Sequence, residues 1–543
     1  MCGNITAETI ESLLNMNYGF IIDNRKCIGC HACTVACKSE HEVPVGVNRT
    51  WVKYIEKGTF PDTRRLFSVM RCNHCADAPC VEICPVTALF TRKDGIVDFD
   101  TRRCIGCKAC TQACPYDALY MHPDEHTAAK CNYCSHRTDI GLEPACVNVC
   151  PEHAIISGDM DNPLSEISQL LARESVQVRK PEKGTQPKLY YIEGDAASLK
   201  PTEANPDTGY MWSSQASGVG HYAKFAEERI RTNADKSVPQ ALYQIESRTR
   251  GKGTKEKARR VYDAPGKGVL WGWEVTAYVW TKAIAAGAFL VPFLGLKLFA
   301  GEVPDSVGRT GAALAIVFLG ITGLLLIKDL GRPERFLYVL LRPQWKSWLV
   351  RGAYFITVYG LILSLWWAAK LLAINSALPF LEWTGVVFAL LTAVYTAFLF
   401  AQAKGRDFWQ SPMLGVHMIL HSVMAGLAVF ALAGMFLTEN ADWLKNLRFL
   451  AIGALIVHLV TLAVELWTAH TTDDARATIE LITNGRFRVP FWAGMVLVGN
   501  ILPLVLLFFG QPVTAALSGI LILVGLYIAE HIWVRAPQMI PLS

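Results

Sequence analysis

The stretch Cys27-Ile-Gly-Cys30-His-Ala-Cys33-Thr-Val-Ala-Cys37 gathers four cysteines into one short segment near the start of the chain. A spacing of two residues lets successive thiolates of a tight loop face a common centre, and soft thiolate ligands suit iron–sulfur clusters or zinc. Three more quartets follow: Cys72, Cys75, Cys80 and Cys84, then Cys104, Cys107, Cys110 and Cys114, then Cys131, Cys134, Cys146 and Cys150. Because all four quartets are complete, the sequence predicts four [4Fe–4S] clusters.

The spacing inside the quartets separates the iron–sulfur interpretation from the zinc alternative. The first and third quartets have the two-two-three spacing of bacterial ferredoxins, in which the fourth cysteine binds the neighbouring cluster. Zinc sites more often combine two separate Cys-x2-Cys units than present four cysteines in one compact run. The spacing therefore favours iron–sulfur clusters, and Cys2, the cysteine left over, is expected to be an incidental free thiol.

Composition predicts that part of the chain is solvated by lipid. Of 543 residues, 52% are hydrophobic and only 18% are charged, whereas an average soluble domain carries about 25% charged residues. A formal net charge of +5 is small for this length and gives no case for nucleic-acid binding. Every cysteine lies before residue 151, which predicts two dissimilar parts and argues against a secreted disulfide scaffold.

Three regions are expected along the chain. Residues 1–160 form a cysteine-rich soluble domain, residues 161–268 an irregular connector, and residues 269–543 a membrane domain. The connector ends in a basic stretch that is either a solvated linker or a juxtamembrane anchor for anionic headgroups. Its position directly before the first long apolar run favours the anchor. The basic residues are Lys252, Lys255, Lys257, Arg259, Arg260 and Lys267.

Eight apolar segments in the third region approach the ~20 residues that a helix needs to cross a bilayer. They are residues 271–299, 308–328, 347–373, 380–402, 413–437, 447–470, 490–510 and 513–535. An even number of spans returns the C-terminus to the side of the cysteine-rich domain. Loops on that side are richer in Lys and Arg than the opposite loops, and the N-terminal segment has no secretory signal pattern. We therefore expect a multi-pass inner-membrane protein with its cysteine-rich domain on the cytoplasmic side.

The quartets, with Cys-Ile-Gly-Cys in two of them and Cys-Pro in three, resemble the four-cluster subunits that accompany molybdopterin oxidoreductases. Those subunits serve dimethyl-sulfoxide, polysulfide, tetrathionate and formate enzymes. The resemblance implies two ferredoxin-like modules, in which the first quartet pairs with the fourth and the second with the third. The implied ligand sets are set 1 (Cys27, Cys30, Cys33, Cys150), set 2 (Cys131, Cys134, Cys146, Cys37), set 3 (Cys72, Cys75, Cys80, Cys114) and set 4 (Cys104, Cys107, Cys110, Cys84).

The segment Asp329-Leu-Gly-Arg-Pro-Glu-Arg-Phe336, directly after the second span, resembles the signature of the polysulfide-reductase membrane subunit, the NrfD family. The eight spans, Ala286-Gly-Ala-Phe289 and Tyr395-Thr396 fit the same family. This resemblance implies a protein without haem that exchanges electrons with quinone near the membrane face bearing the clusters. The implied fold class is an α+β ferredoxin-like double module joined to an all-α polytopic membrane domain of eight transmembrane helices. In this family the two parts are usually separate chains, so the fusion is a departure.

Ionisable side chains inside the spans also predict a quinone site, because such groups are costly in lipid and are functional candidates by default. Nearly all of them fall in the half of the membrane domain nearer the cysteine-rich domain, and quinone reduction needs acid–base groups beside its electron source. The candidates for quinone binding and proton transfer are Glu274, Lys282, Asp329, Arg332, Tyr395, His417 and Glu465.

Structural roles are the alternative for several of these side chains. Asp329 can instead pair with Arg332 or Arg335 at the end of its helix. His417 and His421, one turn apart on one helical face, can be hydrogen-bonded packing residues. Their spacing also suits haem, but His458 is the main further histidine deep in a span, so no haem is expected.

The leading functional hypothesis is an electron-transfer and membrane-anchor subunit. It would connect a separate molybdopterin or tungstopterin catalytic chain, of the formate, sulfite or sulfur-compound class, to menaquinone or ubiquinone in the membrane. The first alternative is a quinol dehydrogenase module like that of alternative complex III. It is weakened because the Cys-x2-Cys-His match of the chain, Cys27 to His31, lies inside the first cysteine quartet and so does not mark a separate haem site. The second is a redox-driven proton-translocating module. The sequence leaves open the substrate, the direction of electron flow and the oligomeric state.

Overall fold

The fold is known from a computed structural model, which describes residues 16–59, 61–206, 258–264, 266–300, 304–437, 442–468, 470 and 472–543. The chain divides into two compact units. The first comprises Met1–Leu270 together with Pro541–Ser543, and the second comprises Trp271–Ile540. We call them the cysteine unit and the membrane unit.

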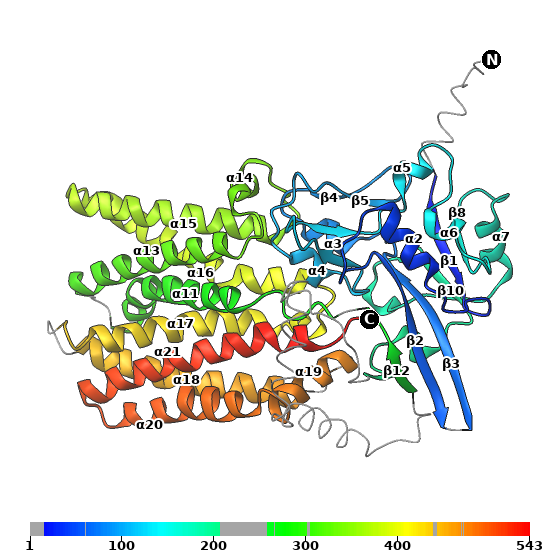
Figure 1. Cartoon of the computed structure of the whole chain (residues 1–543). Helices are drawn as coiled ribbons and strands as arrows, with labels where there is room; N and C mark the ends of the chain where they lie inside the picture. The colour runs from blue at the N-terminus through cyan, green and yellow to red at the C-terminus, as the bar shows by residue number, and fades with distance from the viewer. Residues whose placement is uncertain are drawn as a thin grey trace. The chain divides into compact units, whose positions relative to one another are not determined.

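The cysteine unit is built from short strands and short helices (Figure 1). Its strands are β1 (Tyr18–Asp23), β2 (Thr50–Thr59), β3 (Asp62–Arg71), β4 (Leu89–Thr91), β5 (Val97–Phe99), β6 (Leu119–Met121), β7 (Ala128–Lys130), β8 (Ile155–Asp159), β9 (Val176–Gln177), β10 (Leu189–Ile192), β11 (Asn205–Pro206) and β12 (Ala258–Tyr262). Its helices are α2 (Ala32–Glu40), α3 (Pro79–Ile83), α4 (Ala109–Ala113), α5 (Ser135–Thr138), α6 (Ala145–Asn148), α7 (Glu166–Arg173) and α8 (Ala196–Leu199). The ferredoxin-like α+β class that the family resemblance implies is confirmed.

One four-stranded sheet of this unit has the strand order β8-β1-β10-β9. Strand β1 is buried from Gly19 to Asp23, pairs antiparallel with β8 and pairs parallel with β10. Residues 161–206, expected to belong to an irregular connector, therefore continue the ordered cysteine unit through α7, β9, β10 and α8. The reason is non-local: Leu189-Tyr-Tyr-Ile192 is too short to stand out in the sequence, and its partner strand begins 171 residues earlier, at Tyr18.

The second sheet, in the order β11-β12-β2-β3, contains part of the basic stretch that was expected to lie against lipid. Arg259 and Arg260 lie on β12, 2.6 Å from Glu56 and 3.2 Å from Asp263. Lys267 lies 2.6 Å from Asp117. These three cations are thus ion-paired within the cysteine unit. The partners of Arg259 and Lys267 come from distant parts of the chain, and that of Arg260 lies three residues further on. Lys252, Lys255 and Lys257 lie outside the described residues.

The membrane unit is all-helical, and the eight expected spans are confirmed by eight helices long and apolar enough to cross a bilayer. Its helices, shown in green to red in Figure 1, are α11 (Trp273–Leu290), η3 (Val291–Leu296), α12 (Lys297–Ala300), α13 (Asp305–Lys328), α14 (Tyr338–Leu341), α15 (Trp348–Leu371), α16 (Leu378–Gln402), α17 (Met413–Ala433), α18 (Asp442–Trp467), α19 (Asp473–Thr483), η7 (Pro490–Ile501), α20 (Leu502–Phe508) and α21 (Pro512–Arg535). Helix α11 continues through η3 as the first span, and η7 continues into α20 as the seventh.

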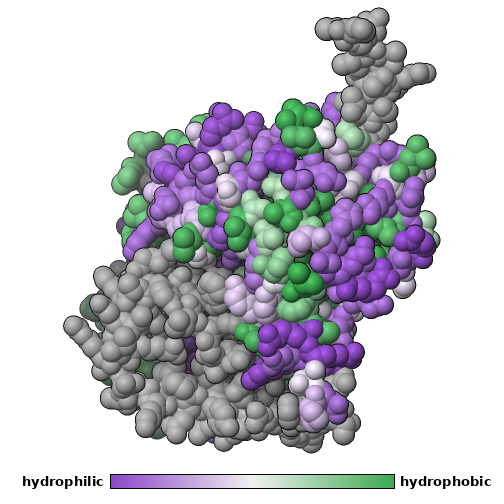
Figure 2. Space-filling model, turned by 45° about the vertical axis from the view of Figure 1, so that its right-hand side comes forward, coloured by the Kyte–Doolittle hydropathy of each residue, from purple (hydrophilic) through white to green (hydrophobic). Residues whose placement is uncertain are grey.

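The surfaces of the two units differ as their solvents require. Hydrophilic side chains cover most of the coloured face in Figure 2, with smaller apolar patches between them. Large exposed apolar side chains are instead frequent along the spans of the membrane unit, among them Leu324, Leu361, Phe380, Val460 and Val505. Lipid makes such exposure favourable, so these residues mark lipid-facing surface.

Helices α11 and α17 form the centre of the membrane unit, and each packs against α16 and α21 as well as against the other. Their closest approach lies at Gly287 and Gly426. A Cβ atom added to Gly426 would lie 2.2 Å from the carbonyl oxygen of Gly287, and one added to Gly287 would lie 1.9 Å from that of Ser422. Small residues that allow backbones to touch are the usual basis of helix association in lipid.

The Gly426→Val substitution is expected to prevent this approach and to lower the amount of folded protein several-fold, since overpacking costs about 1–3 kcal/mol or more. The measurement is the recovery of the detergent-extracted full chain in size-exclusion chromatography, detected by the visible absorbance of its iron–sulfur clusters. Gly453→Val on α18 is the matched control, because a Cβ there meets no atom within 4 Å. Equal recovery of both variants would contradict this account of the packing.

Candidate functional site

The two Cys-Ile-Gly-Cys loops adopt the same backbone conformation. Gly29 and Gly106 both have φ 72°, and the residues after the second cysteine, His31 and Lys108, have φ 62° and 61°. Positive φ is readily adopted by glycine, and a Cβ at Gly29 would lie 2.5 Å from the ring of Phe67. Each loop leads directly into a helix: α2 carries Cys33 and Cys37, and α4 carries Cys110 and is followed at its C-cap by Cys114.

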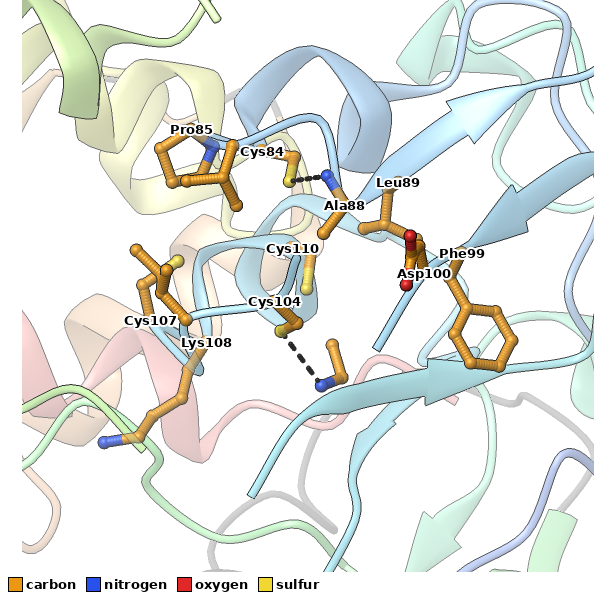
Figure 3. Close-up of a pocket in the computed structure, with 13 residues that line it drawn as sticks. Cys84, Pro85, Ala88, Leu89, Phe99, Asp100, Cys104, Cys107, Lys108 and Cys110 are labelled. Carbon is orange, nitrogen blue, oxygen red and sulfur yellow. Dashed lines mark hydrogen bonds between the residues drawn. The ribbon is translucent and has the colours of Figure 1, made fainter. Parts of the chain in front are cut away.

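Sets 1 and 4 each line a pocket of their own. One pocket is lined by Cys27, Cys30, Cys33 and Cys150, and another by Cys104, Cys107, Cys110 and Cys84. Figure 3 shows the sulfur atoms of the second group facing one space. The backbone amide of Ala88 donates to Cys84 Sγ at 3.2 Å, and that of Ala128 to Cys104 Sγ at 3.4 Å. The fold thus brings together cysteines from two different quartets in each pocket.

Sets 2 and 3 are grouped in the same way, by mutual electrostatic interaction. Cys37 interacts with Cys131, Cys134 and Cys146, and Cys80 interacts with Cys72, Cys75 and Cys114. Helix packing explains the exchange between quartets, because α2 packs against α6 and α3 against α4. None of these sixteen described cysteines forms a disulfide.

The four sets follow one another in numerical order. Cys33 of set 1 interacts electrostatically with Cys146 of set 2. Cys72 of set 3 interacts with Cys131 of set 2. Cys110 of set 4 interacts with Cys80 of set 3. Neighbouring sets are therefore close in space, as an electron relay requires.

Burial disfavours the thiolate form of the cysteines unless a positive charge lies beside them. Desolvation raises the pKa of Cys33 and of Cys134 to about 12 and holds the pKa of Cys80 and Cys110 well above its ordinary value. A buried thiol therefore stays protonated in water-free surroundings unless a metal takes the place of the proton. Four thiolates around one pocket fit a [4Fe–4S] cluster, whose irons supply that positive charge.

Arg71 is a fully buried cation between sets 1 and 2, with 0% of its side chain exposed. Its Nη1 donates to Cys146 Sγ at 3.2 Å, and its guanidinium lies 4.4 Å from the centre of the Phe20 ring. Burial alone would lower the pKa of Arg71, but the thiolates of Cys146, Cys131 and Cys33 raise it above its ordinary value. Nε and Nη2 have no hydrogen-bond partner among the described residues, so these donors can serve cluster sulfides.

A second buried cation, Lys130, lies beside sets 2 and 3. Its ammonium donates to the carbonyl oxygens of Val97 and, at 2.7 Å, Cys131, and it interacts electrostatically with Cys72. His74, between Cys72 and Cys75 in the sequence, is neutral, because burial holds its pKa well below the ordinary value. The backbone amide of Val97 donates to its Nδ1 at 3.2 Å.

In the membrane unit, the structure brings Lys282 and Tyr395 together. Lys282 is 1% exposed and donates to Ala393 O at 2.9 Å and to Thr396 Oγ1 at 2.6 Å. Its ammonium lies 4.8 Å from the centre of the Tyr395 ring. The last turns of α16 therefore hold the amine through a carbonyl, a hydroxyl and an aromatic face.

Tyr278 connects this pair to two carboxylates. It interacts electrostatically with Tyr395, Asp329 and Glu530, and Lys282 also interacts with Glu530. Tyr278 is on the same helix as Lys282, one turn earlier, and is buried. We call Lys282, Tyr395, Tyr278 and Asp329 the amine group.

His417 and Glu465 belong to a second buried cluster. His417 Nε2 lies 2.9 Å from Glu465 Oε2. One turn along α17, His421 Nδ1 lies 2.7 Å from Glu530 Oε1, and its Nε2 lies 3.2 Å from His458 Nε2. We call these three histidines and two carboxylates the histidine cluster.

The other two expected candidates occupy different surroundings. Glu274 is half-buried in the first turn of α11, two turns or ~12 Å before Lys282 along the helix. Arg332 lies outside the spans, with Nη1 3.5 Å from Glu334 Oε1. Both remain candidates by their position in the sequence.

Several residues of these sites were missed by the sequence analysis. Tyr278 and Asn500 are uncharged, so a search for ionisable groups within spans passes over them. Arg71 and Lys130 lie in the middle of the cysteine pattern, but nothing in the spacing distinguishes a buried cation from a solvated one. His421, His458 and Glu530 were visible as polar residues within spans; only the packing of α17, α18 and α21 joins them.

Comparison with known proteins agrees with this division of the chain. Residues 264–540 match the family model described as "Polysulphide reductase, NrfD", and residues 26–89 and 63–160 match two models described as 4Fe-4S dicluster domains. A tetrathionate reductase subunit of Salmonella typhimurium is 44% identical over 198 residues, which are 36% of this chain and 79% of that protein. A polysulfide reductase subunit of Wolinella succinogenes is 42% identical over 180 residues, which are 32% of this chain and 93% of that protein. Protein NrfC of Escherichia coli is 42% identical over 194 residues, which are 35% of this chain and 86% of that protein.

The buried charge of Arg71 yields a prediction about cluster energetics. A cation beside a cluster stabilises its reduced, more negative state, so Arg71→Met should make one midpoint potential more negative by ~60 mV, equivalent to ~1.4 kcal/mol for one electron. The measurement is a redox titration of the full chain followed by electron paramagnetic resonance. Arg64→Met is the matched control, because Arg64 lies exposed on the same strand, β3. Unchanged potentials in an Arg71→Met protein that retains its clusters would contradict the assignment.

Proposed function

Since the protein belongs to the polysulphide reductase NrfD family and joins its membrane domain to an iron–sulfur electron-transfer unit, we propose that it links a catalytic partner subunit to the membrane quinone pool. The observation that carries the proposal is the unbroken series of sets 1 to 4. In this proposal each set binds one [4Fe–4S] cluster, and the four clusters form a line. Cluster chemistry is one-electron transfer, and the protein supplies the spacing and the electrostatics.

Electrons enter or leave the series through the partner at set 1. Cys30 is exposed, and the apolar side chains around this set, Ile28 and Val35, are 55% and 64% exposed. Exposed apolar residues beside a redox centre suit a protein interface, where desolvation brings two centres within tunnelling distance. The sulfurs of sets 2 and 3 are buried, which suits internal relay positions.

At the other end of the series, the chain itself leads to the membrane unit. Lys267, three residues before the end of the cysteine unit, pairs with Asp117, which closely follows Cys114 of set 3. Arg179 Nη2 donates to Leu542 O at 3.1 Å, and its guanidinium lies 5.9 Å from the centre of the Tyr116 ring. Both covalent connections to the membrane unit therefore start beside the third quartet, which supports electron exit from sets 3 and 4.

Quinone is proposed to react at the amine group. Its reduction takes up two protons with two electrons, so the oxygens of the headgroup need donors that can transfer protons. Lys282 and Tyr395 supply an ammonium and a phenol in one buried place, and Asp329 supplies a carboxylate nearby. The bundle end that carries these groups is the end at which the polypeptide enters at Trp271 and leaves at Ile540.

The catalytic partner is proposed to be a molybdopterin or tungstopterin protein. Relatives of the cysteine unit include proteins named as subunits of tetrathionate, polysulfide and arsenate respiratory reductases, which supports a multisubunit reductase. We place the chain in the inner membrane. The loops at the end of the bundle where the polypeptide enters are rich in Lys and Arg, which supports an orientation with the cysteine unit on the cytoplasmic side. The chain would then be the electron-transferring anchor of that complex.

Purification of the complex from its native membrane tests the partner. We expect about sixteen irons per chain, as four cubanes require, and a larger copurifying chain that contains molybdenum or tungsten. Native mass spectrometry and metal analysis measure both. A copurifying chain with c-type haem in place of the pterin protein would instead support the quinol dehydrogenase alternative, and a complex without either would contradict the proposal.

Two conservative substitutions test the quinone site. Tyr395→Phe removes one hydroxyl and Asp329→Asn removes one acid, so each is expected to lower quinone turnover by at least about tenfold, the effect of ~1.4 kcal/mol on a barrier. The assay follows oxidation or reduction of a soluble quinone analogue by the cluster-loaded chain. Tyr354→Phe is the matched control, because the Tyr354 hydroxyl donates to Leu340 O on the loop side of α15. Parental turnover in both variants would move the quinone site elsewhere in the bundle.

A further inference from the structure

The histidine cluster joins three spans of the membrane unit through side chains that are almost completely buried. His417 and His421 come from α17, His458 and Glu465 from α18, and Glu530 from α21. Their exposed fractions are between 1% and 4%. One ring nitrogen from each histidine lies within 4.8 Å of the corresponding nitrogens of the other two.

Hydrogen bonds to fixed acceptors orient two of the rings. His458 Nδ1 lies 2.7 Å from Asn500 Oδ1, and the amide of Asn500 is itself fixed because its Nδ2 donates to Met495 O at 2.8 Å. His458 Nδ1 must therefore donate. His421 Nδ1 likewise donates to the carboxylate of Glu530.

This orientation leaves two lone pairs facing each other. A neutral histidine that carries its proton on Nδ1 has a lone pair on Nε2, and the Nε2 atoms of His421 and His458 are 3.2 Å apart. Two lone pairs at that distance repel unless a cation lies between them. Two imidazole nitrogens bound to one tetrahedral zinc ion at 2.0–2.1 Å are about 3.3 Å apart, so the observed separation is that of two ligands of one metal.

The third histidine offers such an ion a further ligand, and the carboxylates offer the negative charge that balances it. Both ring nitrogens of His417, and Glu465 Oε2, are buried without an aligned hydrogen-bond partner among the described residues, although His417 Nε2 and Glu465 Oε2 are 2.9 Å apart. The two carboxylates carry two negative charges into an apolar interior, where unpaired charge is very costly. One divalent cation neutralises both.

From these contacts we propose that the histidine cluster is a binding site for one divalent first-row transition-metal ion, with zinc as the best fit. His421 and His458 bind it through Nε2, and His417 supplies the third imidazole. Glu530 and Asn500 hold the ligands in orientation, which is the usual arrangement of carboxylate or amide acceptors behind metal-bound histidines. Imidazole ligands select such ions over magnesium or calcium. The site cross-links α17, α18 and α21, independently of where quinone reacts.

The test uses the full chain, purified in detergent with its clusters intact from cells grown with added zinc. After gel filtration with EDTA, we expect about one zinc per chain, and zinc-edge X-ray absorption should show a nitrogen and oxygen shell without sulfur. A sulfur shell would mean zinc in a cysteine set and would overturn the proposal. The proposal would also be overturned if the protein holds no zinc and the parental protein and its histidine variants have equal contents of manganese, iron, cobalt, nickel and copper. A proton shared between His421 and His458 would then explain their short distance.

Substitutions connect the metal to the site. His421→Gln and His458→Gln should each lower bound zinc at least tenfold without loss of cluster absorbance. His531→Gln is the matched control, because His531 lies next to Glu530 on α21 but faces Phe487 rather than the cluster. Parental zinc content in both His421→Gln and His458→Gln would overturn the proposal. If those variants fail to fold, the zinc-edge X-ray absorption spectrum of the parental protein still decides between the outcomes.

Discussion

A charge that is removed from water must be met by an opposite charge, and both units of this protein are organised around that constraint. In the cysteine unit the buried charges are thiolates, which iron, Arg71 and Lys130 compensate. In the membrane unit they are the ammonium of Lys282 and the carboxylates of Glu465 and Glu530. Lys282 is held by groups of α16, and Glu465 and Glu530 lie 2.9 Å and 2.7 Å from histidines of α17. A misplaced partner would leave such a buried charge uncompensated.

The same constraint explains the interleaved architecture of the cysteine unit. A compact run of four cysteines cannot bury all its sulfurs around one centre while its helix continues, so the fourth cysteine of each quartet serves the neighbouring pocket. Packing of α2 on α6 and of α3 on α4 makes this exchange reciprocal. The two pockets of each pair therefore share secondary structure, and the closeness of set 1 to set 2, and of set 3 to set 4, follows directly from the exchange. Sets 2 and 3 are brought together separately, through Cys131 and Cys72. An electron relay therefore comes from the way the thiolates are buried, without a separate device.

Fusion of the two units changes their association from an encounter between two chains into an intramolecular one. The relatives of the cysteine unit match only about a third of this chain while being covered over most of their own length. A covalent link raises the effective concentration of one unit at the other and fixes their ratio at one to one. The ion pairs of Lys267 with Asp117, and of Arg259 with Glu56, fasten the residues before the first span to the rest of the cysteine unit. A restrained connection of this kind reduces the entropy that docking must otherwise overcome.

The sequence alone determined the chemistry of the clusters and the number of spans, because both are local properties. Cysteine spacing specifies thiolate pockets within a few residues, and ~20 apolar residues in a row have no other favourable surroundings than lipid. Tertiary structure decided what depends on distant segments. It placed residues 161–206 in the cysteine unit through the pairing of β10 with β1, and it brought Arg71 beside Cys146. It also divided the buried polar residues of the spans into the amine group and the histidine cluster. Lys282 and Tyr395 are separated by more than a hundred residues, and only the side-by-side packing of α11 and α16 makes them neighbours. Apolar helices associate through shape and small residues rather than through a sequence-readable periodicity, so which polar side chains meet inside the bundle is known only once the helices are packed.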